Sequence, residues 1–124
     1  MCNRSISLPA LLVAGAMLMS HASAQDYPAR VIRLVVPVAA GGLTDIVARR
    51  IAQKLQERLS QSVIVDNRPG AGGIIGVEAV ARAAPDGYTL LMAYPGPLVV
   101  NPFVYASLPY DAARDFAPVK APGI

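Results

Sequence analysis

Residues 31–45 read VIRLVVPVAAGGLTD, and residues 63–73 read VIVDNRPGAGG. In both stretches a short run of apolar, mostly β-branched residues leads into a glycine-rich turn, and helical spacing follows. Glycine lets the backbone turn sharply and approach a ligand without an intervening side chain. The free N–H groups that open each following helix would point at the same place and favour an anion. The doubled pattern therefore predicts an anion-binding cradle between two strand-to-helix turns.

The alternation of strand-like and helix-like segments continues along the chain. Strands are expected at residues 31–36, 62–66 and 88–93, and helices at residues 46–59 and 74–84. This order is typical of a parallel sheet flanked by helices, so the expected fold class is α/β. Ligands of open α/β sheets bind at the carboxyl ends of the strands, which is where both glycine turns fall.

Apolar residues recur at helical spacing in the first expected helix, which predicts one buried stripe. The stripe consists of Val47, Ile51, Leu55 and Leu59. Thr44 or Asp45 is the expected N-cap of this helix. After Tyr94, repeated prolines predict a long connection with one helical turn at residues 103–106. Residues 116–120 look like the approach to another strand.

Residues 1–24 have the features of a secretory signal peptide. Arg4 precedes an apolar run, and the segment ends in the small-residue sequence Ala-Ser-Ala. Export to the periplasm is therefore expected. The single cysteine, Cys2, and the single histidine, His21, both lie in this segment. The exported part would then have no disulfide, no thiol nucleophile and no histidine for acid–base catalysis or metal binding.

Charge and motifs argue against nucleic acid and against a nucleotide cofactor. The formal net charge is only +3, which does not favour nucleic acid or a membrane surface as a partner. A dinucleotide site is disfavoured because Ile75 stands at the third glycine position of the fingerprint. No carboxylate follows the third strand to bind a ribose, and no P-loop lysine motif occurs. We therefore expect no cofactor.

Few polar side chains near the turns are candidates for chemistry. Arg68 could bind a ligand carboxylate, or it could be a solvated arginine in an Asn-Arg-Pro turn. Asp45 would repel an anion, which favours a role in capping the helix and ordering the first turn. The other aspartates are scattered over turns, and no two of them are positioned as acid and base. The sequence therefore predicts no enzyme activity.

Several segments, in order and spacing, resemble the substrate-binding proteins of the tripartite tricarboxylate transporters, called the Bug family. These segments are Tyr27-Pro28, 37–45, 67–73, 84–92, Asn101-Pro102, 108–111 and 115–119. Together they cover almost all of the chain after residue 24.

The resemblance implies a two-domain periplasmic binding protein (type II) that closes around a small carboxylate. Such a protein would deliver its ligand to the membrane components of a tripartite tricarboxylate transporter. The contacts that the resemblance implies are Ala40, Gly41, Gly42 and Asp45 in the first turn, and Gly70, Ala71, Gly72 and Gly73 in the second. It implies a third contact loop around residues 94–97, and no catalytic residue, metal or cofactor.

The chain departs from the family pattern in length and at single positions. Family members are much longer, so residues 25–124 are expected to form an incomplete N-terminal α/β ligand-binding domain, with the hinge and second domain absent. Val38, Leu43 and Pro97 stand where an aromatic residue, a smaller residue and a threonine are usual. The family pattern ends after Val119. The alternative interpretation is a truncated or frameshifted product with no transport activity.

Overall fold

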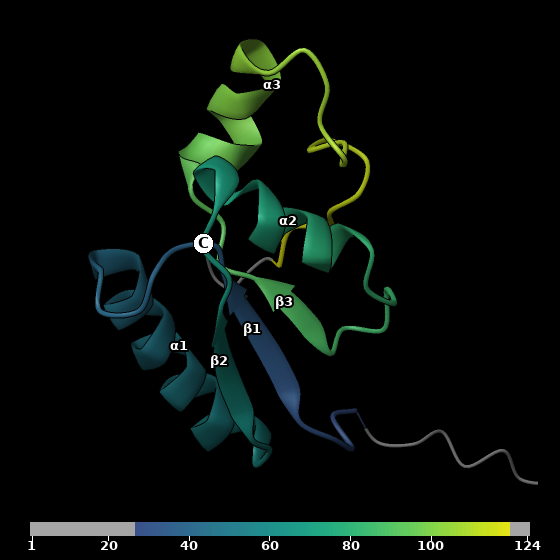
Figure 1. Ribbon diagram of the computed structural model, residues 1–124. Helices are drawn as coiled ribbons and strands as arrows, with labels where there is room; N and C mark the ends of the chain where they lie inside the picture. The colour runs from purple at the N-terminus through teal and green to yellow at the C-terminus, as the bar shows by residue number, and fades with distance from the viewer. Residues whose placement is uncertain (1–26, 120–124) are drawn as a thin grey trace, which may run out of the picture.

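The computed structural model describes residues 27–119, so the expected signal peptide lies outside the described part of the chain. The elements are β1 (Ile32–Val36), α1 (Leu43–Leu59), β2 (Val63–Asn67), η1 (Ala71–Gly73), α2 (Ile74–Ala81), β3 (Thr89–Leu91), η2 (Gly96–Val100) and α3 (Asn101–Val104). Strands and helices alternate as expected from β1 to β3, and only helical segments follow β3 among the described residues (Figure 1). η1 is a short 3₁₀ turn and η2 is π-helical.

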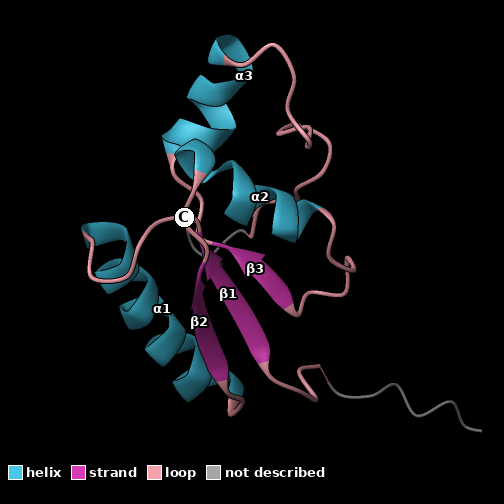
Figure 2. Cartoon of the chain, viewed as in Figure 1, coloured by secondary structure: helices cyan, strands magenta, loops and turns pink. Residues whose placement is uncertain are grey.

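The three strands form one parallel sheet in the order β2-β1-β3 (Figure 2). In the central strand, Ile32 lies opposite Val63 of β2, and Leu34 lies opposite Leu90 of β3. The crossover from β1 to β2 and the crossover from β2 past β1 to β3 run in opposite directions across the sheet, so their right-handed course places α1 and α2 on opposite faces. The predicted α/β architecture is therefore confirmed.

The core lies between α1 and the sheet. Three alternate residues of β1 point to this face and are buried, and small residues of the helix pack on them. This cluster consists of Ile32, Leu34, Val36, Ala48, Ala52 and Val63. Val35 faces the other side of the sheet, and it and Val77 of α2 are fully or almost fully buried. Burial on both faces explains why the run in β1 is nearly continuous in apolar residues.

The predicted buried stripe of α1 was partly wrong. Leu55 and Leu59 do pack against the core, but the side chains of Val47 and Ile51 are 40% and 39% exposed. Ala48 and Ala52 are buried instead. The physical reason is size, because two alanines one turn apart let the helix backbone approach the sheet closely. This contact turns the β-branched residues of α1 away from the sheet.

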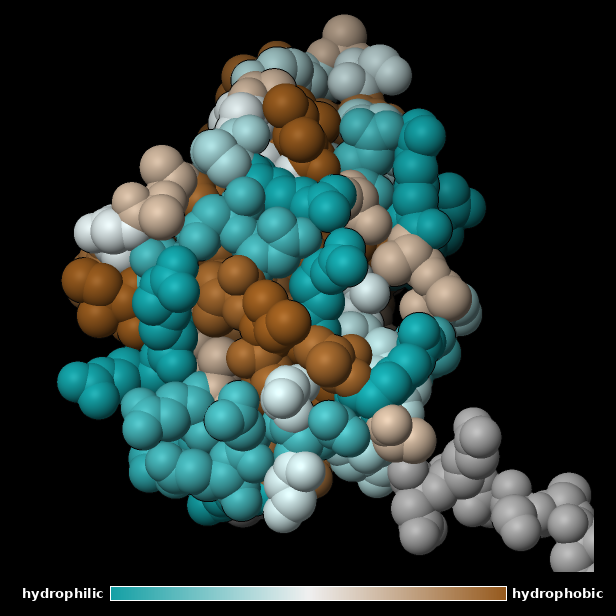
Figure 3. All heavy atoms as spheres, turned by 60° about the horizontal axis from the view of Figure 1, so that its bottom comes forward, coloured by the Kyte–Doolittle hydropathy of each residue, from teal (hydrophilic) through white to brown (hydrophobic). Residues whose placement is uncertain are grey.

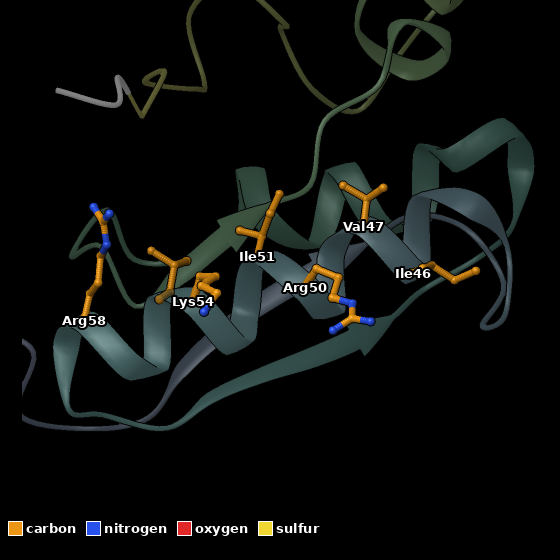
Figure 4. A pocket seen from close by; sticks show the side chains of 7 residues that line it. Ile46, Val47, Arg50, Ile51, Lys54 and Arg58 are labelled. Carbon is orange, nitrogen blue, oxygen red and sulfur yellow. The ribbon is translucent and has the colours of Figure 1, made fainter. Parts of the chain in front are cut away.

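The outward apolar residues of α1 line a shallow groove of about 420 Å³. Figure 4 shows Val47 and Ile51 pointing to the same side of the helix, with Arg50, Lys54 and Arg58 along its length. Apolar side chains outside α1 are exposed as well. Figure 3 shows a group of apolar residues in the middle of one face, surrounded by polar residues. Within residues 27–119, no helix is long and apolar enough to cross a membrane.

Helix boundaries also differ from those predicted. α2 ends at Ala81 and not at residue 84, because the N–H of Ala83 bonds back to the carbonyl of Val80 and closes the helix. Helical structure begins at Gly96 and not at residue 103. Two of the prolines that predicted a connection, Pro97 and Pro102, lie in the first turns of η2 and α3, where a backbone N–H is not needed.

Residues 116–119, the described part of the segment expected to lead into another strand, contain no strand themselves. Phe116 instead packs edge-to-face on Tyr110, with ring centroids 6.2 Å apart. This aromatic contact holds the segment beside Tyr110, so its apolar residues do not extend the sheet.

Gly76 sets how closely α2 approaches the end of β1. A Cβ atom at this position would lie 2.7 Å from the Cβ of Pro37, 2.8 Å from the carbonyl oxygen of Arg68 and 2.9 Å from the Cα of Pro37. Two of these three neighbours are backbone atoms, which cannot move aside as a flexible side chain could. Any larger residue must therefore push α2 away from the sheet.

We expect Gly76→Ala to lower the free energy of unfolding by about 1–3 kcal/mol, although alanine favours a helix over glycine. Urea unfolding followed by circular dichroism would measure this loss. Gly42→Ala is the matched control, because its Cβ would meet no atom closer than 3.8 Å. Equal stability of the Gly76→Ala protein and the unaltered chain would contradict the close approach.

Candidate functional site

The first glycine turn connects β1 to α1 and leaves the start of the helix open. Gly41 has φ +88°, a conformation that favours glycine, and Gly42 is the N-cap residue of α1. No side chain caps this helix, so the predicted caps Thr44 and Asp45 were wrong. The first N–H groups of α1 are therefore available to an external acceptor.

Asp45 orders this turn from inside. It is only 2% exposed, although it lies in the first turn of α1. Its Oδ2 accepts hydrogen bonds from the N–H of Gly41 at 2.9 Å and from Nε of Arg49 at 3.0 Å, and its Oδ1 accepts one from Asn67 at 2.9 Å. The bond from Gly41, followed by those from Arg49 and Asn67, lowers the pKa of Asp45 from 3.8 to about 2. The carboxylate is thus ionised and fully engaged.

Asn67 joins the two turns. It ends β2, where the second turn begins, and its Nδ2 donates to Asp45 and to the carbonyl oxygen of Val38 at 3.2 Å in the first turn. Its Oδ1 accepts a hydrogen bond from Arg49 at 3.1 Å. One side chain therefore uses donor and acceptor together to hold the first turn against the end of β2.

The second glycine turn has an unusual backbone. Four consecutive residues have positive φ: Gly70 (+127°), Ala71 (+47°), Gly72 (+63°) and Gly73 (+90°). Ala71 is the only one of them with a Cβ, and it sits in a region that side chains rarely adopt. Gly73 donates its N–H to the carbonyl of Gly70 at 2.9 Å and is the N-cap of α2, again with no side-chain cap.

The predicted contact residues divide into two groups. Six are exposed, namely Ala40, Gly41, Gly42, Gly70, Ala71 and Gly72. Asp45 and Gly73 are buried, and both are engaged in hydrogen bonds within the protein. The exposed group can approach a ligand directly through its backbone, whereas the buried pair can act only by shaping the turns.

Arg68 forms an ion pair within the protein, although its side chain is still 40% exposed. Its guanidinium donates to the carboxylate of Asp66 at 2.9 Å, and its backbone N–H donates to Val36 at the end of β1. Asp66 also lies 3.8 Å from Arg33. The charge of Arg68 is therefore directed at a neighbouring strand residue.

The loop predicted as a third contact, residues 94–97, lies beside the second turn. A Cβ on Gly73 would fall 2.7 Å from the hydroxyl oxygen of Tyr94 and 3.3 Å from Pro97. Pro97 is fully buried and occupies the start of η2. The loop therefore packs on the buried residue of the second turn.

Sequence reasoning assigned no role to Arg49, Asn67 and Asn101, although all three contact the turns. One local signal existed for Arg49, which follows Asp45 by four residues on the same helix. The partners of Asn67 and Asn101 lie 18 to 29 residues away, and no local pattern marks them. Among residues 27–119, no group of histidine, cysteine, aspartate or glutamate side chains could hold a metal ion.

The family model described as "Tripartite tricarboxylate transporter family receptor" matches residues 47–121, which include the whole second turn. The chain belongs to this family. The predicted resemblance to the Bug proteins is thereby confirmed. BugT of Bordetella pertussis is 43% identical over 122 residues, which are 98% of this chain and 37% of the relative. The chain thus spans about a third of the length of the curated relatives that it matches.

Solved structures agree with this assignment. MatC from Rhodopseudomonas palustris, with bound malate, has a TM-score of 0.72 and 40% identity over 75% of this chain and 32% of its own. An R. palustris protein with adipate has a TM-score of 0.68 and 44% identity over 71% of this chain and 29% of its own. The family and its structural neighbours are periplasmic solute-binding proteins, which supports a non-enzyme interpretation.

The buried carboxylate of Asp45 makes stability depend on pH. The pKa of Asp45 is about 2 in the folded chain and about 4 in the unfolded chain. Its stabilising effect is therefore complete above about pH 4. The effect is lost as the pH falls through about 2. We expect Asp45→Asn to be less stable than the unaltered chain at neutral pH, and the difference to shrink between about pH 4 and pH 2.

Urea unfolding over this pH range would test the dependence. Asp86→Asn is a suitable control, since it removes only an exposed ion pair with Arg30 and should cost less than about 1 kcal/mol. A stability difference for Asp45→Asn that stays constant down to pH 2 would contradict the role assigned to the ionised carboxylate.

Proposed function

We propose that this chain carries one side of the ligand site of a periplasmic solute-binding protein, in which two glycine turns bind a small carboxylate. The observation that carries the proposal is the pairing of two helices without side-chain caps, whose preceding turns are joined by Asn67 and Asp45. The relatives MatC and the adipate-bound R. palustris protein hold dicarboxylates.

The exposed backbone of residues 40–42 and 70–72 supplies the contacts in this proposal. The open N–H groups and the positive ends of the helix dipoles favour a carboxylate. Asp45 does not contact the ligand, because its oxygens are already hydrogen-bonded and Arg49 balances its charge. It shapes the first turn, and Gly73 shapes the second.

Export by a signal peptide in residues 1–24 would bring the protein to the periplasm, where its ligand passes to the membrane components of a tripartite tricarboxylate transporter. No chemistry on the ligand is part of this function. The second domain of a clamshell would supply further contacts and exclude water, and residues 25–124 would be the incomplete N-terminal domain. We therefore expect the chain alone to bind carboxylates weakly.

Nuclear magnetic resonance can detect such weak binding residue by residue. We expect millimolar adipate or malate to shift the backbone amide resonances of Gly42, Ala71 and Gly72 in the ¹⁵N-labelled protein. The corresponding neutral diamides should leave these resonances in place, because they lack the charge that the helix ends favour. Shifts that are absent, or equal with the diamides, would overturn the proposal. Micromolar affinity by calorimetry would overturn the expected weakness.

A pair of glycine substitutions separates the site from general stability. Gly72→Ala and Gly87→Ala each place a Cβ at a positive φ, +63° and +80°, and each should cost about 1–2 kcal/mol of stability. Gly87 lies in the turn before β3 and contacts Tyr27, away from both glycine turns. Only Gly72→Ala should remove the carboxylate-dependent shifts. Equal loss in both variants would point to destabilisation as the cause.

A further inference from the structure

Asn101, the first residue of α3, reaches back to the second glycine turn. Its side chain is buried, with 7% of the residue exposed, and its Nδ2 donates to the carbonyl oxygen of Gly72 at 3.2 Å. We propose that Asn101 is a positioning residue that holds the peptide between Gly72 and Gly73 in the orientation required for carboxylate binding. This inference rests on the proposed function and adds to it a residue outside both turns.

The conformation of the second turn has to be stabilised by contacts from outside the turn. Four successive residues with positive φ include Ala71, whose Cβ makes this conformation unfavourable. The peptide that follows, between Gly72 and Gly73, has glycine on both sides, so no Cβ hinders its rotation. Local sterics therefore do not select one orientation for this peptide, and contacts from elsewhere must do so.

Two hydrogen bonds hold this peptide from opposite ends. The carbonyl of Gly72 accepts from Asn101, and the N–H of Gly73 donates to the carbonyl of Gly70 at 2.9 Å. The C=O and N–H of a trans peptide point in opposite directions, so one orientation satisfies both bonds. Loss of the Asn101 donor would leave the Gly72 carbonyl free to turn toward the ligand side, where its partial negative charge would repel a carboxylate.

The backbone of Asn101 is itself fixed on both sides. Its N–H donates to the carbonyl of Gly96, and its carbonyl accepts from the N–H of Tyr105 at 3.0 Å. Tyr110 is buried nearby, and its hydroxyl donates to the carbonyl of Pro97. Burial raises the pKa of Tyr110, and its contact with Asn101 acts in the opposite direction. The donor thus projects from a rigid support.

The first arm of the test needs no ligand. In Asn101→Asp the side chain keeps its size, but at neutral pH its carboxylate cannot donate and would repel the Gly72 carbonyl. We expect the amide resonances of Gly72 and Gly73 to shift or broaden at neutral pH. They should return toward their normal positions in mild acid, because a buried carboxyl facing a carbonyl has a raised pKa and, once protonated, donates again.

Two variants serve as controls for this arm. Asn101→Ala has no donor at any pH, so its turn resonances should stay displaced in mild acid. Phe103→Ser lies on the same helix at a position 89% exposed and should leave the turn unchanged. Unchanged Gly72 and Gly73 resonances in Asn101→Asp at neutral pH would overturn the proposal. So would an equal recovery in acid by Asn101→Ala.

A measurement on the unaltered protein keeps the proposal testable if the variants do not fold. One side-chain amide proton of Asn101 should exchange with solvent at least about tenfold more slowly than those of Gln53, which is exposed on α1. Equal exchange of the two side chains would overturn the hydrogen bond on which the proposal rests.

The second arm adds adipate. If the ordered turn falls to about a tenth of the population in Asn101→Ala, the apparent dissociation constant for adipate should rise about tenfold. Unchanged adipate affinity beside a displaced turn would overturn the positioning role. If the unaltered protein shows no adipate-dependent shifts, the proposed function fails. The first arm then still decides whether Asn101 orders the turn.

Discussion

The buried carboxylate of Asp45 is the interaction on which the arrangement of both turns depends. It receives hydrogen bonds from the first turn, from its own helix and from the end of β2, so three separate segments meet at one side chain. A charge at 2% exposure is stable only when it is fully paired, and here Arg49 and two amide donors complete its partners. The anionic group nearest the first turn is therefore satisfied by the protein, which leaves the helix ends electropositive.

The elements that could be predicted are those whose structure depends on neighbouring residues in the sequence. The β-branched run of β1 and the two glycine turns were visible in the sequence because strand propensity and backbone freedom are properties of single residues. The rotation of α1 was not visible, since periodicity defines an apolar stripe but does not say that Ala48 and Ala52 would be the buried residues. Close packing favoured the smallest side chains over Val47 and Ile51.

The candidate site likewise contains residues that the sequence could identify and residues that it could not. Its glycines could be placed from spacing alone, and the ordering role that the sequence favoured for Asp45 agrees with the hydrogen bonds of its carboxylate. Asn67 and Asn101 lie in segments that carry the family resemblance, but no role could be assigned to them, because an asparagine in a loop or beside a proline has many ordinary uses. Their importance comes from partners 22 and 29 residues away, which only the folded chain brings within hydrogen-bonding distance.

Gly76 belongs to neither turn, yet it has a consequence for both. Its missing Cβ lets the first turn of α2 touch Pro37 and the Arg68 carbonyl, which are the residues that open the first and second turns. Gly76, which has no side chain, thus sets how closely the start of α2 approaches the turn that precedes α1. The separation of the two turns, and with it the size of a group that both could reach, is therefore encoded at a residue outside the proposed ligand contacts.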